Sequence, residues 1–311
     1  MEILILSYVS RSGSTFLSNF ISKNDDICVL PEANILTKRL LQKPHETFNQ
    51  STILRKDFLH DQKLKNWNID YEGILKNSTN SNNFEIFYHI LNAYRQKYKP
   101  VAQKILFKES KNILPAIDYM LSRKQIEFKF ITITRDGRAV YASQKASVNS
   151  VVQMPMEVSP IASAKRWSNF MKMVGRYSKL ENTLVLTYED LIINYEETTK
   201  NLSNFLGYNI NSFFTTSADL DKRIPESQRH LHKRINDPPD KARINSWEQE
   251  LSNMEIFLYE KYASNELSPT YNIRNPSVSL LKYPLFIVYY KIKELIRIIL
   301  FGIVKRLKRL T

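Results

Sequence analysis

The chain is poor in two residue types that often point to a fold or a compartment. Its 311 residues include one cysteine, Cys28, and only six glycines. A single cysteine excludes an internal disulfide framework and favours a reducing compartment. The sequence also lacks the basic segment and cleavage site of a secretory signal, and its first apolar run, from Ile3, is better interpreted as a strand. We therefore expect a protein that is not secreted.

Acidic residues are in the minority. Lysine and arginine total 45 against 31 aspartates and glutamates, which gives a net charge of +14. This excess favours an anionic ligand, a nucleic acid or a membrane surface as partner. The sequence has no nucleic-acid-binding motif and its aromatic residues follow core-like patterns, so we expect no nucleic acid among the partners.

The first turn of the chain lacks the lysine of a nucleotide-binding P-loop. Residues 2–9 form a continuous apolar run, typical of a strand buried on both faces, and helical spacing follows over 13–22. A Walker A loop reads G-x-x-x-x-G-K-[ST]. Aligned on Gly13, this chain has Tyr8 at the first glycine and Ser14 at the lysine. ATP or GTP hydrolysis is therefore disfavoured.

The same turn is nevertheless suited to an anion. Gly13 lets the backbone approach closely, Ser14 and Thr15 add hydroxyl donors at a helix N-terminus, and Arg11 adds a positive charge. The alternative is an ordinary strand-to-helix turn with Ser12 as the N-cap.

Strands and helices alternate along the chain at βαβ spacing. Further strands are expected at 26–32, 102–112 and 182–191, a strand, turn and helix at 127–147, and helices at 113–124, 160–180 and 194–206, the last ending at Gly207. This alternation predicts an α/β fold, a parallel sheet flanked by helices.

The domain organisation follows from the segments outside this alternation. Residues 34–100 have helical spacing and no comparable strand, which predicts a helical insertion on the acceptor side. Residues 208–246 are polar and irregular and predict a lid-like loop. We expect one domain over 1–275, followed by a basic amphipathic tail over 276–311.

The tail is the most strongly charged segment. From Lys282 to Thr311, eight basic residues accompany one acid, so this segment carries half of the net charge. On a helical wheel seven apolar residues share one face: Leu285, Val288, Ile292, Leu295, Ile296, Ile299 and Ile303. Charges interrupt the run, whereas a spanning helix needs about 20 mostly apolar residues. The pattern favours an interfacial helix on an anionic membrane. Packing on the protein's own core or on a partner subunit are the alternatives.

A second turn provides another candidate anion site. "FITITRDGRAVYAS" places Arg135 at the end of a strand and Ser143 in the helix that follows. Two anion sites on one sheet edge suit a nucleotide with phosphates at two positions.

These segments together resemble the sulfotransferases that use 3′-phosphoadenosine 5′-phosphosulfate (PAPS). "RSGSTFL" (11–17) is similar to the 5′-phosphosulfate signature of the carbohydrate and tyrosylprotein branch. "TRDGRAVYAS" (134–143) is similar to the 3′-phosphate signature, with Gly137 where proline is usual. Three further matches follow the family's order: "KESKN" (108–112), "LTYEDLIINYEETTKNLSNFLG" (186–207) and "KARINSWEQEL" (241–251). The resemblance implies the P-loop-like sulfotransferase fold and PAPS as donor, without a metal.

The resemblance also implies roles for particular residues. The donor-binding loop corresponds to Arg11, Ser12, Gly13, Ser14, Thr15 and Phe16, with Phe16 against adenine and Arg11 at the leaving oxygen. Arg135 and Ser143 correspond to 3′-phosphate ligands. Tyr188 matches a cofactor-contacting position, with a structural tyrosine as the alternative. Lys241 and Arg243 match a loop that closes over the cofactor, with solvated loop charges as the alternative.

The catalytic base is expected at the same sheet edge. Glu32 follows the second strand and resembles the glutamate of bacterial, glycan and tyrosylprotein relatives, with helix capping as the alternative. The histidine of the cytosolic small-molecule branch is replaced by Ser110, which favours Glu32 and leaves Glu109 as the second candidate. Lys108 is expected to help position the sulfuryl group or the acceptor.

The sequence thus predicts a cytoplasmic enzyme, peripheral at the inner face of the membrane. It moves a sulfuryl group from PAPS to a hydroxyl, with a glycan or lipid-linked saccharide as the favoured acceptor. Two alternatives stay open: a P-loop kinase or other phosphotransferase, and a non-catalytic membrane-docked binding protein. His230 and His232 form an H-x-H pair without a cysteine, so we expect no metal site there.

Overall fold

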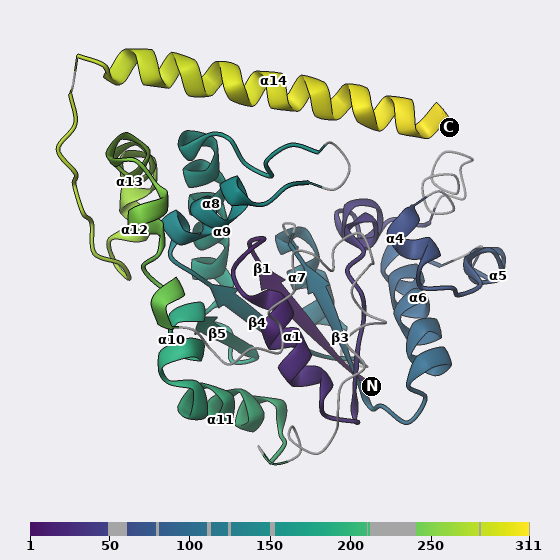
Figure 1. Ribbon diagram of the computed structural model, residues 1–311. Helices are drawn as coiled ribbons and strands as arrows, with labels where there is room; N and C mark the ends of the chain where they lie inside the picture. The colour runs from purple at the N-terminus through teal and green to yellow at the C-terminus, as the bar shows by residue number, and fades with distance from the viewer. Residues whose placement is uncertain are drawn as a thin grey trace.

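The computed structural model describes residues 1–48, 61–78, 81–110, 113–123, 126–149, 153–209, 211, 241–279 and 281–310. In these residues, five parallel strands form one sheet in the order β2-β3-β1-β4-β5 (Figure 1). The strands are β1 (Glu2–Tyr8), β2 (Ile27–Val29), β3 (Lys104–Glu109), β4 (Glu127–Thr134) and β5 (Thr183–Thr187). Helices cover both faces of the sheet, so the predicted α/β fold class is confirmed.

The central strand β1 separates two apolar cores. Every residue of β1 is buried. Ile3 and Ile5 pack into a core with the 34–100 segment and the end of α9 (Pro160–Tyr177), whereas Leu4 and Leu6 pack into a core with α1 (Ser14–Ser22) and α11 (Tyr195–Leu206). Because successive side chains of a strand point to opposite faces, a strand buried on both faces reads as a continuous apolar run.

The register of the sheet brings the loops after three strands to one edge. Ser7 of β1 pairs with Glu109 of β3 on one side and with Thr132 of β4 on the other. The strands therefore end nearly level, and the loops that follow β1 and β4 lie next to each other. This edge, at the carboxyl ends of the strands, is where open α/β folds bind ligands.

Two sequence predictions about local structure are wrong. The strand predicted over 182–191 ends at Thr187, because the Thr187 hydroxyl accepts a hydrogen bond from the Asp190 N–H and starts α10 (Tyr188–Ile193). The alternative in which Ser12 caps α1 is also wrong. The N-cap is Gly13, with φ of 87°, in a left-handed conformation that glycine adopts without strain.

The described part of the 34–100 segment forms helices joined by turns, with one isolated β-bridge between Thr47 and Asn82. The helices are α2 (Asn34–Leu36), a π-helical turn η1 (Thr37–Leu41), α4 (Gln62–Lys65), α5 (Tyr71–Lys76) and the long α6 (Asn83–Tyr98). These helices pack on the side of β3 (Figure 1). Of the predicted lid-like loop 208–246, residues 210 and 212–240 lie outside the described residues, as do His230 and His232. The proposed division into a domain and a tail stays a prediction.

α7 (Leu114–Ser122) packs into the same core as the 34–100 segment. The helices at the other end of the molecule are α8 (Gly137–Ala146), α12 (Trp247–Glu250), α13 (Asn253–Leu267) and α14 (Tyr283–Leu310). α13 packs against α9, and α14 lies across the same end of the molecule as one long helix (Figure 1). None of the described helices is both long enough and apolar enough to cross a membrane.

Candidate active site

The loop after β1 wraps tightly around a tyrosine from α10. A Cβ atom on Gly13 would lie 2.5 Å from Cδ2 of Tyr188, so this backbone needs glycine both for its φ angle and for its close packing. Arg11 also adopts a left-handed conformation, with φ of 79°. Such a conformation is strained for a residue with a side chain and often marks a functional loop. Ser12 and Ser14 are buried beneath the loop.

The arginines predicted from two separate motifs meet at this edge. Nε of Arg11 donates to Oγ of Ser143 at 3.1 Å, although the two residues are 132 positions apart. Nη1 of Arg135 donates to the Arg11 carbonyl at 3.0 Å and Nη2 donates to the Arg243 carbonyl at 3.1 Å. The face of the Tyr188 ring lies 4.2 Å from the Arg135 guanidinium carbon. The structure therefore gathers Arg11, Arg135, Ser143, Tyr188 and Arg243.

Positive charge is concentrated in this cluster. Burial, followed by the charges of Arg135 and Arg243, lowers the pKa of Arg11. Like charges held together at a partly buried site repel one another, and a bound anion would relieve that repulsion. Within the described part of the chain, the buried Nε–H of Arg135 has no hydrogen-bond partner. Both observations are typical of a site for a phosphate or sulfate group.

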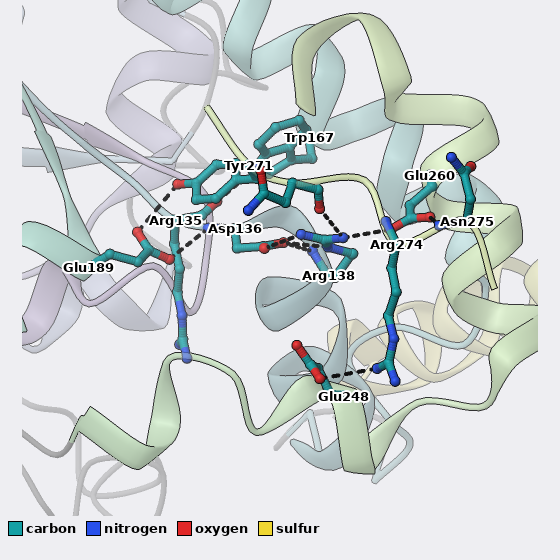
Figure 2. A network of polar contacts seen from close by, with 11 residues as sticks. Arg135, Asp136, Arg138, Trp167, Glu189, Glu248, Glu260, Tyr271, Arg274 and Asn275 are labelled. Carbon is teal, nitrogen blue, oxygen red and sulfur yellow. Dashed lines mark hydrogen bonds and ion pairs between the residues drawn. The ribbon is translucent and has the colours of Figure 1, made fainter. Parts of the chain in front are cut away.

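A buried polar network fixes the backbone of the Arg135 loop (Figure 2). The Trp167 indole N–H donates to the Arg135 carbonyl at 3.0 Å. A carboxylate oxygen of Glu189 accepts from the Asp136 N–H at 3.0 Å, and its other oxygen accepts from the Tyr271 hydroxyl at 3.3 Å. Figure 2 shows the Arg135 side chain pointing out of this network while its backbone stays in it. The guanidinium therefore lies outside the network, on a backbone that the network holds in place.

Arg138 is the cation at the centre of the same network. It contacts both Asp136 oxygens, at 3.1 and 2.7 Å, one Glu260 oxygen at 2.5 Å and the Asn272 carbonyl at 2.9 Å. Burial alone would lower the pKa of Arg138, but the hydrogen bonds and charges of Asp136 and Glu260 outweigh burial and raise it. The loop that carries Arg135 is thereby joined to α13 and to the segment after it.

The glycine that departs from the usual family motif has a steric reason. A Cβ atom at Gly137 would lie 2.2 Å from the Tyr259 hydroxyl oxygen and 2.8 Å from Cδ2 of Trp167. In this chain two large aromatic side chains fill the space that a proline ring would occupy.

Glu32 lies at the same edge, with its carboxylate held by two side chains. The Tyr8 hydroxyl donates to Oε1, and Nζ of Lys63 lies 2.5 Å from Oε2. Ala33 is the N-cap of the following helix, so Glu32 does not cap it. Glu109, the second candidate for the base, is completely buried, whereas the Glu32 side chain is 26% exposed.

Lys108 lies between Tyr8 and the first turn of α1. Its Nζ lies 3.4 Å from Oγ1 of Thr15, in the first turn of α1, and 5.5 Å from the centre of the Tyr8 ring. Phe16 packs edge-on against Tyr195 at a centroid distance of 6.5 Å. Lys241 is exposed in a short 3-10 turn that includes Arg243.

Sequence reasoning missed four residues of this region. Tyr8 stands directly before the donor loop at the end of β1, a position that could have marked it. Glu189 lies in the quoted "YED" motif beside Tyr188, and Arg138 lies in "RDGR". Lys63 carries no local signal, because it reaches Glu32 from a helix 31 positions away in the chain.

Comparison with known proteins agrees with this geometry. The family model described as the sulfotransferase family matches residues 3–212. No curated protein matches the chain in a sequence search. Among solved structures, the sulfotransferase domain from the curacin biosynthetic pathway is similar, with a TM-score of 0.54 and 16% identity over 88% of this chain and 98% of that one.

A second solved structure shares the fold. The sulfotransferase domain of the Synechococcus PCC 7002 olefin synthase has a TM-score of 0.50 and 19% identity over 85% of this chain and 94% of that one. At these identities the two structures support the fold alone. The family model spans more than half of the chain and includes both turns that the sequence predicts to bind anions, so the chain belongs to the sulfotransferase family.

Proposed function

We propose that this protein transfers a sulfuryl group from PAPS to an acceptor hydroxyl by in-line displacement. The observation that carries the proposal is the cluster of Arg11, Arg135 and Arg243 at the carboxyl edge of the sheet, in which Arg11 donates to Ser143 and Arg135 donates to the carbonyls of the other two arginines. The charges of Arg135 and Arg243 act on Arg11, and such a concentration of positive charge suits a ligand with several anionic groups, such as the 3′-phosphate and 5′-phosphosulfate of PAPS.

The donor loop supplies the second part of the site. Gly13, Ser14 and Thr15 bring free backbone N–H groups and hydroxyls to the start of α1, where the helix dipole favours an anion. With Arg11 turned toward Ser143, Lys108 is the cation beside Thr15. We therefore assign Lys108 to the charge that develops on the transferred group, and Arg11 to the donor nucleotide.

Glu32 is the proposed general base. Its carboxylate is partly exposed and lies one tyrosine ring away from Lys108. In the transfer, the acceptor oxygen forms a bond to sulfur, the bond from sulfur to the phosphate oxygen breaks, and the acceptor proton passes to Glu32. The buried Glu109 is less open to an acceptor.

Binding of the product nucleotide tests the donor assignment. We expect 3′-phosphoadenosine 5′-phosphate (PAP) to bind more tightly than ATP in calorimetric titration. Arg135→Gln removes a charged donor and should weaken PAP binding by about 2–3 kcal/mol, or roughly 30–150-fold. Arg274→Gln, on the surface, is the matched control and should leave PAP affinity unchanged. Tight binding of ATP without binding of PAP would favour a kinase instead.

Turnover tests the base. Incubation with [³⁵S]PAPS and octyl β-D-glucoside, with water as a competing acceptor, measures total sulfuryl transfer. Glu32→Gln should lower kcat by about 100-fold or more while PAP affinity is kept. Wild-type protein that binds PAP but transfers no label to either acceptor would support the non-catalytic alternative.

The arrangement of α14 supports a membrane-associated acceptor. Tyr290 is buried on the body of the protein, together with parts of Tyr283, Phe286 and Ile287. Arg297 donates to the Met156 carbonyl at 3.3 Å, and Glu294 pairs with Arg166 at 3.4 Å. One face of the helix is thereby attached to the domain.

The apolar face predicted from the sequence is a different one, and it points outward. Its seven members are all exposed, from Leu285 at 71% to Ile296 and Ile303 at 48%. An exposed apolar stripe bordered by lysines and arginines suits the interface of an anionic bilayer. The helix also lies at the end of the molecule toward which β1 runs from the N-terminus (Figure 1). A lipid-linked saccharide, or another glycan at the bilayer surface, is therefore the proposed acceptor.

Vesicle binding tests the membrane proposal. We expect co-sedimentation with vesicles of phosphatidylglycerol and phosphatidylcholine, and weaker binding to phosphatidylcholine alone. The double variant Ile292→Glu/Ile296→Glu should weaken binding about tenfold or more. Val101→Glu changes an exposed apolar residue elsewhere and serves as the control. If a second copy of the chain covers this face instead, gel filtration would show a dimer that the double variant loses.

A further inference from the structure

We propose that Tyr8 and Lys63 are positioning residues of this enzyme, which hold the Glu32 carboxylate in one orientation beside the donor loop. The inference rests on the proposed role of Glu32 as the base. It assigns a function to two residues that lie outside the motifs discussed above.

The two residues contact different oxygens of the same carboxylate. The Tyr8 hydroxyl donates to Oε1, and the Lys63 ammonium donates to Oε2 at 2.5 Å. Tyr8 comes from the end of β1 and Lys63 from α4, so the two donors approach from separate elements. With one donor on each oxygen, the carboxylate can neither rotate about its terminal bond nor swing away without breaking a contact.

The carboxylate is also accessible, as a base must be. A carboxylate has two oxygens with about four lone-pair directions in all, so accepting hydrogen bonds does not by itself prevent it from accepting a proton. The Glu32 side chain is 26% exposed and that of Lys63 is 34% exposed. An acceptor hydroxyl can therefore reach the carboxylate at a direction set by Tyr8 and Lys63, and such alignment is a large part of catalysis by a general base.

Tyr8 also fixes the spacing between the base and the donor side of the site. Its hydroxyl is on Glu32 while its ring faces Nζ of Lys108 at 5.5 Å, and that same Nζ lies 3.4 Å from Oγ1 of Thr15. The Tyr8 side chain thus contacts both the carboxylate and the lysine that lies beside Thr15. Because Tyr8 is the last residue of β1, its position follows directly from the sheet.

Lys63 connects the base to the segment that we predict to shape the acceptor pocket. It lies in α4, which packs into the same core as β1 through its neighbour Leu64. A change in that segment would therefore alter the orientation of the base without altering the nucleotide site. This predicts a loss in kcat that is separate from any loss in donor affinity.

The test compares Tyr8→Phe, Lys63→Met and Lys63→Arg in the full chain. Total sulfuryl transfer from [³⁵S]PAPS to octyl β-D-glucoside and water gives kcat and the KM for PAPS, and calorimetry gives the affinity for PAP. Tyr8→Phe keeps the ring beside Lys108 and removes only the hydroxyl. We expect Tyr8→Phe and Lys63→Met each to lower kcat about tenfold or more. PAP affinity and the KM for PAPS should change less than twofold, and Lys63→Arg should restore most of kcat.

Two substitutions of the same types in the 34–100 segment are the controls. Lys43→Met removes an exposed pair with Glu46, and Tyr98→Phe removes a hydroxyl that donates to the Trp67 carbonyl. Both should leave kcat unchanged.

The possible failures are distinguishable. Unchanged kcat in Tyr8→Phe and Lys63→Met, with Glu32→Gln inactive, would overturn the positioning role and leave the base assignment intact. Full activity of Glu32→Gln would overturn the base assignment itself. A fall in PAP affinity that parallels the fall in kcat, or no recovery in Lys63→Arg, would show a structural role instead and would also overturn the proposal.

Discussion

The buried network behind the Arg135 loop makes a quantitative prediction for Arg138→Met. Methionine fills much of the same apolar volume but removes the cation between Asp136 and Glu260 (Figure 2). The side chains of Arg138 and Glu260 are each 3% exposed and that of Asp136 is 6% exposed, so water cannot replace the lost contacts.

The magnitude follows from the carboxylates that are left behind. Removing one partner of a buried ion pair costs about 3–5 kcal/mol, because the other charge stays buried and uncompensated. Glu260 keeps the backbone N–H groups of Arg274 and Asn275, both at 2.9 Å. Asp136 keeps one backbone N–H, from residue 138, at 2.8 Å. Because both carboxylates keep some of their hydrogen-bond donors, we expect the loss of the two contacts together to lower the unfolding free energy by about 3–5 kcal/mol, the range for one buried pair.

Arg274→Met provides a control within the same network. Its guanidinium pairs with Glu248 at 3.2 Å, but the two side chains are 45% and 42% exposed. Exposed pairs contribute only about 0–1 kcal/mol, and the backbone contact of Arg274 with Glu260 survives the substitution. The two arginines thus both contact Glu260, but the side chain of Arg138 is buried and that of Arg274 is exposed.

Urea unfolding followed by tryptophan fluorescence measures both variants. The Trp247 ring lies 4.0 Å from the guanidinium carbon of Arg138, so its emission reports on the network directly. We expect a difference of about 2–5 kcal/mol between the two variants. Equal losses in both, or a loss below about 1 kcal/mol for Arg138→Met, would refute the reasoning that burial of these charges governs the stability of the loop.

Three further predictions concern the packing at two glycines and the titration of two glutamates. Gly137→Ala places a Cβ 2.2 Å from the Tyr259 hydroxyl and should cost about 1–3 kcal/mol in thermal unfolding, whereas Gly175→Ala, with nothing within 4 Å, should stabilise α9 by about 0.5–1 kcal/mol. Burial raises the pKa of Glu189 above 4.5 in the folded protein. The unfolding free energy of the wild type should therefore fall relative to that of Glu189→Gln as pH rises from 4.5 through the folded pKa. A difference in unfolding free energy that does not change with pH would contradict this. Burial alone would raise the pKa of Glu294, but the hydrogen bonds and charges of Arg297 and Arg166 lower it below 4.5, so hydrogen exchange in α14 should increase as pH falls through the folded pKa. That acid-induced increase should disappear in Glu294→Gln.

The elements of the sheet were largely predictable from local pattern. Strands buried on both faces require continuous apolar runs, and parallel strands require helices between them. The order of strands and helices can therefore be predicted from the sequence. The place of the loop after β1 and of Arg135 was predictable in the same way, because a polar turn after a buried strand must lie at the carboxyl edge of the sheet. The boundary of β5 was missed because one hydroxyl, that of Thr187, starts a helix where strand-like residues continue.

The contacts that make this edge a site were not predictable in that way. Arg11 meets Ser143, Glu32 meets Lys63, and Arg138 meets Glu260 across separations of 132, 31 and 122 residues. The apolar stripe of α14 was visible in its periodicity, but the helix is attached to the domain through another face, which includes Tyr290. The periodicity of apolar residues along the sequence indicates which residues favour burial. Which side chains share a carboxylate, or which face of a helix stays uncovered, depends on elements that meet only once the chain has folded.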